Sequence, residues 1–146
     1  GLLILADSRR GAERFPSVGL KINREEFARL SGNTANAPFK HLCRAVSRLA
    51  MERGQPMFVS LSDGGIVGAE PGLEAEHVPC LPVQGEIDVV GAGDAVMANL
   101  TLALAAGAKL NEAMRLAMAA ASIAIHQLGT TGVAKREGIR SLVCAH

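Results

Sequence analysis

Short apolar runs alternate with longer amphipathic segments through the first 60 residues of the chain. Three of these runs have the length and apolar bias of short strands: residues 2–6, 17–22 and 56–61. The two segments between the second and third runs, residues 23–32 and 38–54, carry helix signals instead. Strands that alternate with helices predict a three-layer α/β/α domain with a mainly parallel sheet.

Residues that favour helix ends mark both helical segments. Asn23 precedes the first, and Glu26 follows three positions later, which is the spacing of a capping box. Pro38 suits the first turn of the second helix, and Gly54 suits its end. The second helix has apolar residues at the spacing of a buried stripe: Leu42, Val46 and Leu49.

The middle of the chain predicts a hairpin followed by an edge segment. Residues 62–65 (SDGG) form a turn between the third apolar run and a fourth at residues 66–69. Residues 74–83 are predicted to be extended, and Pro79 and Pro82 confine them to an edge of the sheet.

Beyond Val90 the sequence favours helices, at about residues 92–106 and 112–128. Asn111 is the predicted cap of the second of these helices, and Gly129 is its predicted stop. The chain shows no repeat, linker or low-complexity tract, so residues 1–146 are predicted to form one domain.

Charge and cysteine content argue against several classes of function. Fifteen Lys and Arg residues nearly balance fourteen Asp and Glu residues without a long run of one sign, so neither nucleic-acid nor anionic-membrane binding is predicted. The longest apolar run, residues 116–125, is too short to span a bilayer. Three cysteines without C-x-x-C spacing argue against a disulfide framework or a zinc site and favour the reducing cytoplasm.

The start of the chain predicts that more protein precedes it. Residues 2–6 are apolar on both faces and begin without a cap or lead-in. A buried strand needs a neighbour on each side and seldom opens a domain alone. We therefore expect this chain to be part of a larger protein.

Residues 89–95 (VVGAGDA) form a glycine-rich turn between a β-branched run and an alanine-rich helix. One interpretation is a dinucleotide-binding fingerprint, in which a strand leads into G-x-G. That pattern requires a Gly or Ala three residues after the second glycine, where the bulkier Val96 stands. It also requires a second strand that ends in an acid about 20 residues further on, where the sequence favours a junction between helices.

The second interpretation is an anion site with a base beside it. Gly91 and Gly93 let backbone N–H groups converge at a helix N-terminus, where the helix dipole favours negative charge. A phosphoryl group in transfer carries such charge, and fixed N–H donors stabilise it. Asp94 is not suited to bind phosphate, because like charges repel, but it can take a proton from an attacking hydroxyl. The structural alternative is that Asp94 only stabilises the helix N-terminus, by up to about 1 kcal/mol.

Residues 88–107 (DVVGAGDAVMANLTLALAAG) resemble the second signature of the PfkB, or ribokinase-like, carbohydrate kinases, which is usually D-T-x-G-A-G-D. Other landmarks follow in the order of that family. Residues 20–26 (LKINREE) resemble its K-x-N-x-x-E segment, and residues 59–67 (VSLSDGGIV) resemble its T-x-G-x-x-G nucleotide turn. Residues 118–133 (MAAASIAIHQLGTTGV) are similar to the closing helix that lines the adenine pocket.

The resemblance implies a ribokinase-like fold and an ATP-dependent kinase that requires Mg²⁺. It makes Asp94 the catalytic base and the backbone of Gly91, Ala92 and Gly93 the anion hole. Asn23 and Glu26 fall at positions that the family associates with phosphate and with magnesium, the metal being held through water. Their spacing alone favours a helix capping box, and the two roles can coexist. Further nucleotide contacts are implied for Ser60, Ser62, Gly65, Met118 and Ser122.

The chain departs from the family pattern at three of these landmarks. Val89 replaces the usual Thr of the second signature and lacks its hydroxyl. Ser62 stands where glycine is common in the nucleotide turn, and Met118 where Asn is frequent on the adenine-lining helix. None of the three removes the predicted base or the predicted anion hole.

Members of the family are much longer than this chain, and their N-terminal half supplies the sugar-binding residues and the lid. Residues 1–146 therefore resemble the C-terminal, ATP-binding part, whose partner is the N-terminal half of the same kinase fold. The ADSRR, LKIN and LGTTGV segments favour the heptose-phosphate kinase branch. A homodimer is a further expectation from the family.

The sequence thus predicts a cytoplasmic enzyme that transfers the γ-phosphoryl group of ATP to a hydroxyl of a sugar or sugar phosphate. One alternative is a truncated or non-catalytic nucleotide-binding module, which the missing N-terminal half favours for this polypeptide alone. A dinucleotide-binding oxidoreductase is the other alternative.

Overall fold

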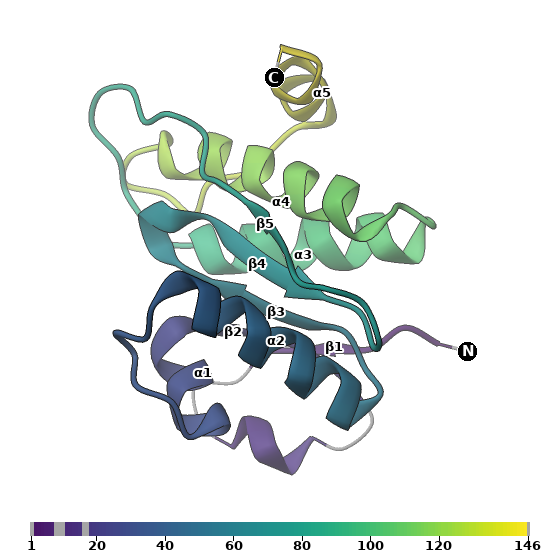
Figure 1. The fold of residues 1–146 in the computed structure, drawn as a ribbon. Coiled ribbons are helices and arrows are strands. Elements are labelled where there is room, and N and C mark those ends of the chain that lie inside the picture. Colours follow the sequence, from purple (N-terminus) through teal and green to yellow (C-terminus); the bar gives the residue numbers. More distant parts are fainter. Residues whose placement is uncertain (1, 8–10, 16–17, 146) are drawn as a thin grey trace. The chain divides into compact units, whose positions relative to one another are not determined.

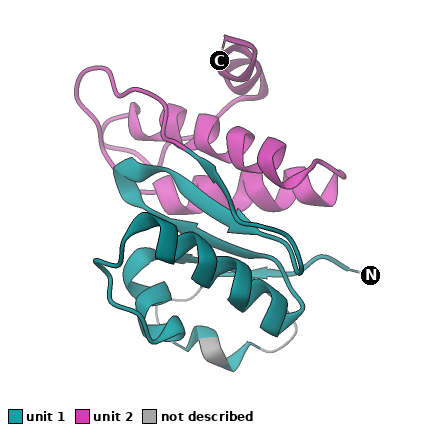
Figure 2. Ribbon diagram, viewed as in Figure 1, with its two compact units in different colours: residues 1–78 teal, residues 79–146 magenta. Residues whose placement is uncertain are grey.

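A computed structural model of the protein describes residues 2–7, 11–15 and 18–145. Residues 8–10, which belong to the ADSRR segment, and His146 lie outside the described residues. The chain divides into two compact units, residues 1–78 (unit 1) and 79–146 (unit 2), coloured teal and magenta in Figure 2.

Unit 1 is built on a mixed sheet with the strand order β1-β2-β3-β4-β5. Its strands within the described residues are β1 (Leu5–Ala6), β2 (Gly19–Asn23), β3 (Met57–Ser60), β4 (Ile66–Ala69) and β5 (Glu76–Val78). The first three strands run parallel, whereas β4 is antiparallel to β3 and β5 is antiparallel to β4. The predicted parallel strands and the hairpin are therefore confirmed. The edge segment predicted at residues 74–83 is a strand over Glu76–Val78 only.

Helices α1 (Arg24–Ser31) and α2 (Phe39–Arg53) lie on the same side of this sheet (Figure 1). Asn23 caps α1, as its capping-box spacing predicts. Gly54 ends α2 in the left-handed region with a φ of 62°, where a glycine has no steric cost. Short 3₁₀ helices, η1 (Ala12–Arg14) and η2 (Ser62–Gly64), complete the elements of unit 1.

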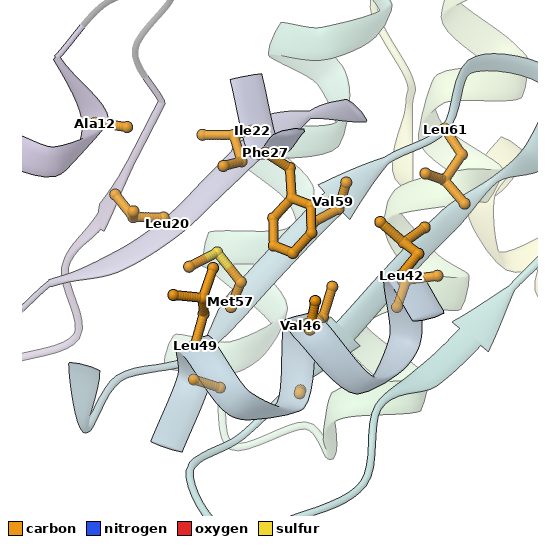
Figure 3. Packing of buried hydrophobic residues seen from close by; sticks show 14 residues of the cluster. Ala12, Leu20, Ile22, Phe27, Leu42, Val46, Leu49, Met57, Val59 and Leu61 are labelled. Atoms are coloured by element: carbon orange, nitrogen blue, oxygen red, sulfur yellow. The ribbon is translucent and has the colours of Figure 1, made fainter. Parts of the chain in front are cut away.

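The core of unit 1 forms between these helices and one face of the sheet (Figure 3). Side chains at alternate positions of β2, β3 and β4 face the same way because successive residues of a strand point to opposite faces. They contribute Leu20, Ile22, Met57, Val59, Val67 and Ala69 to the cluster. The stripe predicted on α2, Leu42, Val46 and Leu49, is buried against them.

Strand β1 is shorter and more exposed than the sequence predicts. Only Leu5 and Ala6 pair with β2, while Leu2 and Ile4 are 88% and 49% exposed. The reason is position, since β1 stands at the end of the strand order and has β2 as its neighbour in the described sheet.

Unit 2 is helical within its described residues. It contains α3 (Ala92–Ala105), α4 (Leu110–Ile125) and α5 (Arg136–Ala145). α3 and α5 each pack against α4. The buried face of α4 consists of small and apolar side chains, including Ala113, Met114 and Ala117. The small alanine side chains allow neighbouring segments to pack closely against this helix.

The limits of α4 differ from the prediction. The N-cap residue is Lys109 rather than Asn111, and the Glu112 carboxylate accepts a hydrogen bond from the Lys109 N–H at 2.9 Å. The glutamate half of a capping box therefore sets this helix start. The helix ends at Ile125, before the predicted stop at Gly129. Helix α5 was not predicted.

The alternation of strands and helices confirms the predicted α/β class. Within the part of the chain that the structure describes, no helix combines the length and the apolar character needed to cross a bilayer.

Candidate functional site

The glycine-rich turn of unit 2 leads directly into helix α3. Gly91 is the N-cap residue, with a φ of 83° and a ψ of −6°, in the left-handed region that favours glycine. A Cβ atom at this position would lie 3.0 Å from Thr131 Cγ2. Gly93 lies within the first turn of the helix. Backbone conformation therefore explains the glycine at position 91 but not the one at position 93.

Backbone N–H groups at the start of α3 are the candidate anion hole. The Ala92 N–H donates to the Val89 carbonyl at 3.2 Å. Among the described residues, no protein acceptor bonds to the N–H groups of Gly93 and Asp94. Such unbonded donors, together with the helix dipole, make this end of α3 suited to a negatively charged group.

Asp94 stands beside these donors with its carboxylate unbonded. The residue is exposed in the first turn of α3. No hydrogen bond or ion pair of the described chain involves this carboxylate. Asp94 therefore does not act as a hydrogen-bonding cap, and its side chain is available to an incoming group.

Asp88 has the opposite character, because both its carboxylate oxygens accept backbone hydrogen bonds. Oδ1 accepts from the Val90 N–H at 3.0 Å, and Oδ2 accepts from the Gly129 N–H at 3.3 Å. The Asp88 N–H donates to the Ile125 carbonyl at 2.7 Å. Asp88 thus fastens the glycine-rich turn to the end of α4, a structural role that the sequence did not reveal.

The predicted adenine-lining residues, Met118 and Ser122, lie in the second half of α4. Met118 is buried and Ser122 is half-buried, one helical turn apart. The Ser122 carbonyl accepts a hydrogen bond from His126 Nδ1 at 2.6 Å. Gln127 then braces the following loop, since its Nε2 donates to the Val133 carbonyl and its Oε1 accepts from the Val133 N–H, at 2.9 and 3.0 Å.

In unit 1, the carboxyl ends of the parallel strands meet at one edge of the sheet, which is where α/β proteins commonly bind ligands. Asn23 ends β2, Ser60 ends β3, and the two residues are partners in the strand register. Ser62 and Gly65 follow in the turn between β3 and β4. The structure therefore brings Asn23, Ser60 and this turn together at one edge.

Asn23 and Glu26 form a complete capping box at the same edge. The Glu26 N–H donates to Asn23 Oδ1 and the Asn23 N–H donates to Glu26 Oε2, both at 2.8 Å. Glu26 keeps one carboxylate oxygen for another partner, which fits a contact to Mg²⁺ through water. Among residues 2–7, 11–15 and 18–145, no cluster of three or more His, Cys, Asp and Glu side chains is arranged to hold a metal directly.

Lys21 and Asp7 form an ion pair at this edge, with Lys21 Nζ 2.7 Å from Asp7 Oδ2. Lys21 is only 5% exposed, so the burial of its ammonium group requires a partner. Ala6 is the strand partner of Leu20, and continuing the register by one residue places Asp7 beside Lys21. An acid directly after a predicted strand is the one local signal for Asp7, and no local pattern identifies Lys21 as its partner.

The turn between β3 and β4 has an unusual backbone. Ser62 has a φ of 55°, and among the described residues it is the only one other than glycine with a positive φ. Gly65 has a φ of 87° and a ψ of −138°, a conformation that glycine alone adopts readily. Ser62 therefore keeps the conformation suited to the glycine that is common at this position in the family.

The strain at Ser62 predicts a difference between two variants that both remove its hydroxyl. Ser62→Gly should be more stable than Ser62→Ala by about 0.5–1 kcal/mol, because a left-handed conformation costs an L-residue more than it costs glycine. Chemical denaturation of the full-length protein measures the difference. Equal stability of the two variants would show that the turn relaxes on substitution.

Among the described residues, the three cysteines form no disulfide. Cys43 is half-buried in α2, and burial raises the pKa of its thiol, which favours the less reactive neutral form. Chemistry at the candidate site therefore depends on carboxylate, hydroxyl and backbone groups.

The residues singled out in the sequence thus fall into two groups, one in each unit. The group in unit 1 consists of Asn23, Glu26, Ser60, Ser62 and Gly65. The group in unit 2 consists of Gly91, Ala92, Gly93, Asp94, Met118 and Ser122. Sequence reasoning missed Asp7 and Gln127, whose roles depend on contacts across loops rather than on a motif.

Comparison with known families and proteins places these groups in context. The family model for pfkB family carbohydrate kinases matches residues 19–136, a range that includes both groups. Among curated relatives, the bifunctional protein HldE of Bradyrhizobium diazoefficiens is 36% identical over 121 residues, which are 83% of this chain and 24% of that protein. HldE of Rhodopseudomonas palustris is 37% identical over 124 residues, 85% of this chain and 25% of that protein.

Solved structures show the same fold. A ribokinase from Arabidopsis thaliana, complexed with ribose and ATP, matches 97% of this chain and 47% of its own with a TM-score of 0.84 and 24% identity. Phosphofructokinase-2 from Escherichia coli, in complex with substrates and products, matches 97% of this chain and 46% of its own with a TM-score of 0.83 and 24% identity. The chain therefore has a ribokinase-like α/β fold. It spans about a quarter of the curated relatives and about half of these solved chains.

Proposed function

Because the chain belongs to the pfkB family of carbohydrate kinases, we propose that the full-length protein transfers the γ-phosphoryl group of ATP to a hydroxyl of a sugar or sugar phosphate. One observation carries the proposal beyond family membership. At the start of α3, unbonded backbone N–H groups stand directly beside Asp94, whose carboxylate has no partner in the described chain. This arrangement suits a reaction in which backbone N–H groups stabilise negative charge while a neighbouring carboxylate accepts a proton.

In the proposed reaction, the Asp94 carboxylate accepts the proton of the acceptor hydroxyl while that oxygen forms a bond to the γ-phosphorus. The bond between the γ-phosphorus and the oxygen that bridges it to the β-phosphate breaks, and ADP leaves with that oxygen. The predicted anion hole at residues 91–93 supplies donors to the non-bridging oxygens and stabilises their charge. Because the Ala92 N–H already donates to the Val89 carbonyl, the N–H groups of Gly93 and Asp94 are the proposed donors. Asp94 returns its proton to solvent before the next cycle.

Residues of unit 1 take the nucleotide-binding roles in this proposal. Ser60, Ser62 and Gly65 contact the nucleotide, and Asn23 contributes near the phosphates. The remaining carboxylate oxygen of Glu26 would accept a hydrogen bond from a water molecule bound to Mg²⁺. When bound, Mg²⁺ would neutralise part of the phosphate charge. In unit 2, Met118 and Ser122 contact the adenine.

The acceptor is proposed to be bound mainly by an N-terminal half of the same kinase fold. This chain spans about half of the ribokinase and phosphofructokinase-2 chains that it matches, which leaves the other half of the fold to bind the acceptor. The ADSRR, LKIN and LGTTGV segments favour a heptose phosphate as the acceptor, and two of the matched relatives are HldE proteins. A homodimer and a cytoplasmic location complete the proposal, the latter because three cysteines without C-x-x-C spacing suit a reducing compartment.

The proposal is tested by a panel of sugars and sugar phosphates incubated with ATP and Mg²⁺ and the full-length protein. We expect ADP formation that depends on one class of acceptor, with phosphorylated acceptor formed in equal amount. ATP binding without phosphorylation of any acceptor would support the alternative, a non-catalytic nucleotide-binding module. NAD binding without a response to ATP would support a dinucleotide-binding oxidoreductase.

Gly93→Val tests the anion hole directly. The residue lies in the first turn of α3, where valine is compatible with helical backbone but its side chain crowds the approach to the N–H groups. We expect the affinity for ATP to fall by about tenfold, which corresponds to roughly 1.4 kcal/mol. Isothermal titration calorimetry on the full-length protein measures the effect.

Ala98→Val is the matched control for that experiment, because Ala98 is an exposed residue in the middle of the same helix. It introduces the same β-branched side chain away from the helix start. Equal loss of ATP affinity in both variants would mean that helix destabilisation, rather than access to the N–H groups, explains the result.

A further inference from the structure

A histidine from the edge strand holds the proposed nucleotide turn. His77 Nε2 lies 2.7 Å from the Gly64 carbonyl oxygen. A carbonyl oxygen can only accept, so His77 Nε2 carries the proton and donates it to this bond. No motif of the sequence pointed to His77, because the contact joins a residue of β5 to the turn between β3 and β4.

Two neighbours fix the position of the His77 ring. In the β4–β5 ladder His77 is the partner of Val67, and partners in a ladder place their side chains on the same face of the sheet. Val67 belongs to the core cluster that also contains the buried residues of α2. Phe39, the first residue of α2, meets the His77 ring edge-on, with ring centroids 4.9 Å apart and an angle of 69° between the planes.

The Gly64 carbonyl belongs to the peptide on which the conformation of the turn depends. Within the turn, the Leu61 N–H donates to the Gly65 carbonyl at 2.8 Å and the Gly64 N–H donates to the Leu61 carbonyl at 2.9 Å. The Gly64 carbonyl shares a rigid peptide plane with the Gly65 N–H, so a bond to one fixes the direction of the other. The Gly65 N–H itself donates to the Ser62 carbonyl at 3.3 Å, so this bond and the bond from His77 together hold the orientation of the peptide. Gly65 lies in a sparsely populated conformation, which makes that orientation sensitive to the loss of either bond.

We infer that His77 is a positioning residue for the nucleotide: its bond to the Gly64 carbonyl holds the turn at residues 61–65 in the conformation that receives ATP. This inference rests on the proposed function of that turn. His77 itself touches the turn through the backbone and does not contact the reacting atoms.

Replacement of the ring by one without a donor tests the inference in the full-length protein. His77→Phe retains a flat ring for Phe39 but removes the hydrogen bond. We expect the KM for ATP to rise by about three- to tenfold, which is the effect of losing one neutral hydrogen bond, with kcat and the KM for the acceptor unchanged. His77→Gln, which restores a side-chain N–H donor, should recover much of the ATP affinity.

His41→Phe is the matched control, since His41 is an exposed histidine on the neighbouring helix α2. It should leave the KM for ATP unchanged. A rise in the KM for ATP with His77→Phe that His77→Gln does not reverse would overturn the inference, because a purely structural effect would explain it. Wild-type affinity for ATP in His77→Phe would overturn it as well.

The failure of the inference is distinguishable from failure of the proposed function. If the wild-type protein binds neither ATP nor ADP in calorimetry, both the proposed function and the role of His77 are overturned. If the wild-type protein phosphorylates an acceptor and His77→Phe binds ATP equally well, the role of His77 alone is overturned.

Discussion

Asp94→Asn should lower the turnover number of the full-length protein by at least about 100-fold while the affinity for ATP changes little. A positioned general base contributes on the order of 10²–10⁴ to a rate, and asparagine cannot accept the proton of the acceptor hydroxyl. ATP binding should survive because the side chain has no partner in the described chain and the neighbouring N–H donors remain in place. Steady-state kinetics and calorimetry together separate the two effects.

A second acid at a helix start provides the control for this experiment. Glu137 is exposed in the first turn of α5 and has no proposed role in catalysis. Glu137→Gln removes the same favourable interaction with a helix dipole, at a cost of up to about 1 kcal/mol in stability, but should leave turnover unchanged. Unchanged turnover in Asp94→Asn would refute the catalytic role and leave helix stabilisation as the function of Asp94.

Asp7→Asn should lower the free energy of unfolding by about 2–3 kcal/mol. It leaves the Lys21 ammonium group, which is 5% exposed, without its carboxylate partner. Breaking a buried ion pair from one side costs roughly 3–5 kcal/mol, and the partial exposure of the Asp7 side chain, 34%, reduces that figure. Chemical denaturation of the full-length protein measures the change.

The double variant Asp7→Asn with Lys21→Met supplies the decisive comparison. Removing both charges leaves no uncompensated ammonium group, so the double variant should be more stable than Asp7→Asn alone. If the single and double variants are equally unstable, the loss comes from packing near β1 rather than from the ion pair.

Local signals in the sequence were sufficient for most of unit 1. Asn23 and Glu26 indicated the start of α1. Pro38 and Gly54 indicated the two ends of α2, where they are the N-cap and C-cap residues. The Ser-Asp-Gly-Gly turn marked the hairpin of β3 and β4. Each of these signals acts within a few residues, so a single sequence carries the information that the fold uses.

Elements that depend on more distant contacts were predicted less well. Helix α4 begins at Leu110 because the Glu112 carboxylate bonds to the Lys109 N–H, which outweighed the cap propensity of Asn111. Helix α5 has none of its residues buried. It was missed although Ile139, Leu142 and Val143 have the spacing of an apolar helix face. The exposure of Leu2 and Ile4 reflects the position of β1 at the end of the sheet, which no local pattern encodes.

The candidate site shows the same division. The glycine-rich turn and Asp94 were found by motif, and the left-handed backbone of Gly91 explains one glycine of that motif. The Lys21–Asp7 pair and the bond between His77 and Gly64 join segments that are 14 and 13 residues apart in the chain. Strand register brings Asp7 beside Lys21, whereas His77 reaches from β5 to the turn before β4, and no local pattern in the sequence specifies either contact.

The two hydrogen bonds accepted by Asp88 have a mechanical consequence. A single carboxylate ties the peptide just before α3 to the turn just after α4, so neither segment can loosen without releasing the other. Fluctuations of the two segments should therefore be concerted, and a ligand that reduces the mobility of one segment should reduce the mobility of the other. A region with few buried contacts thereby gains cooperativity from one shared anchor.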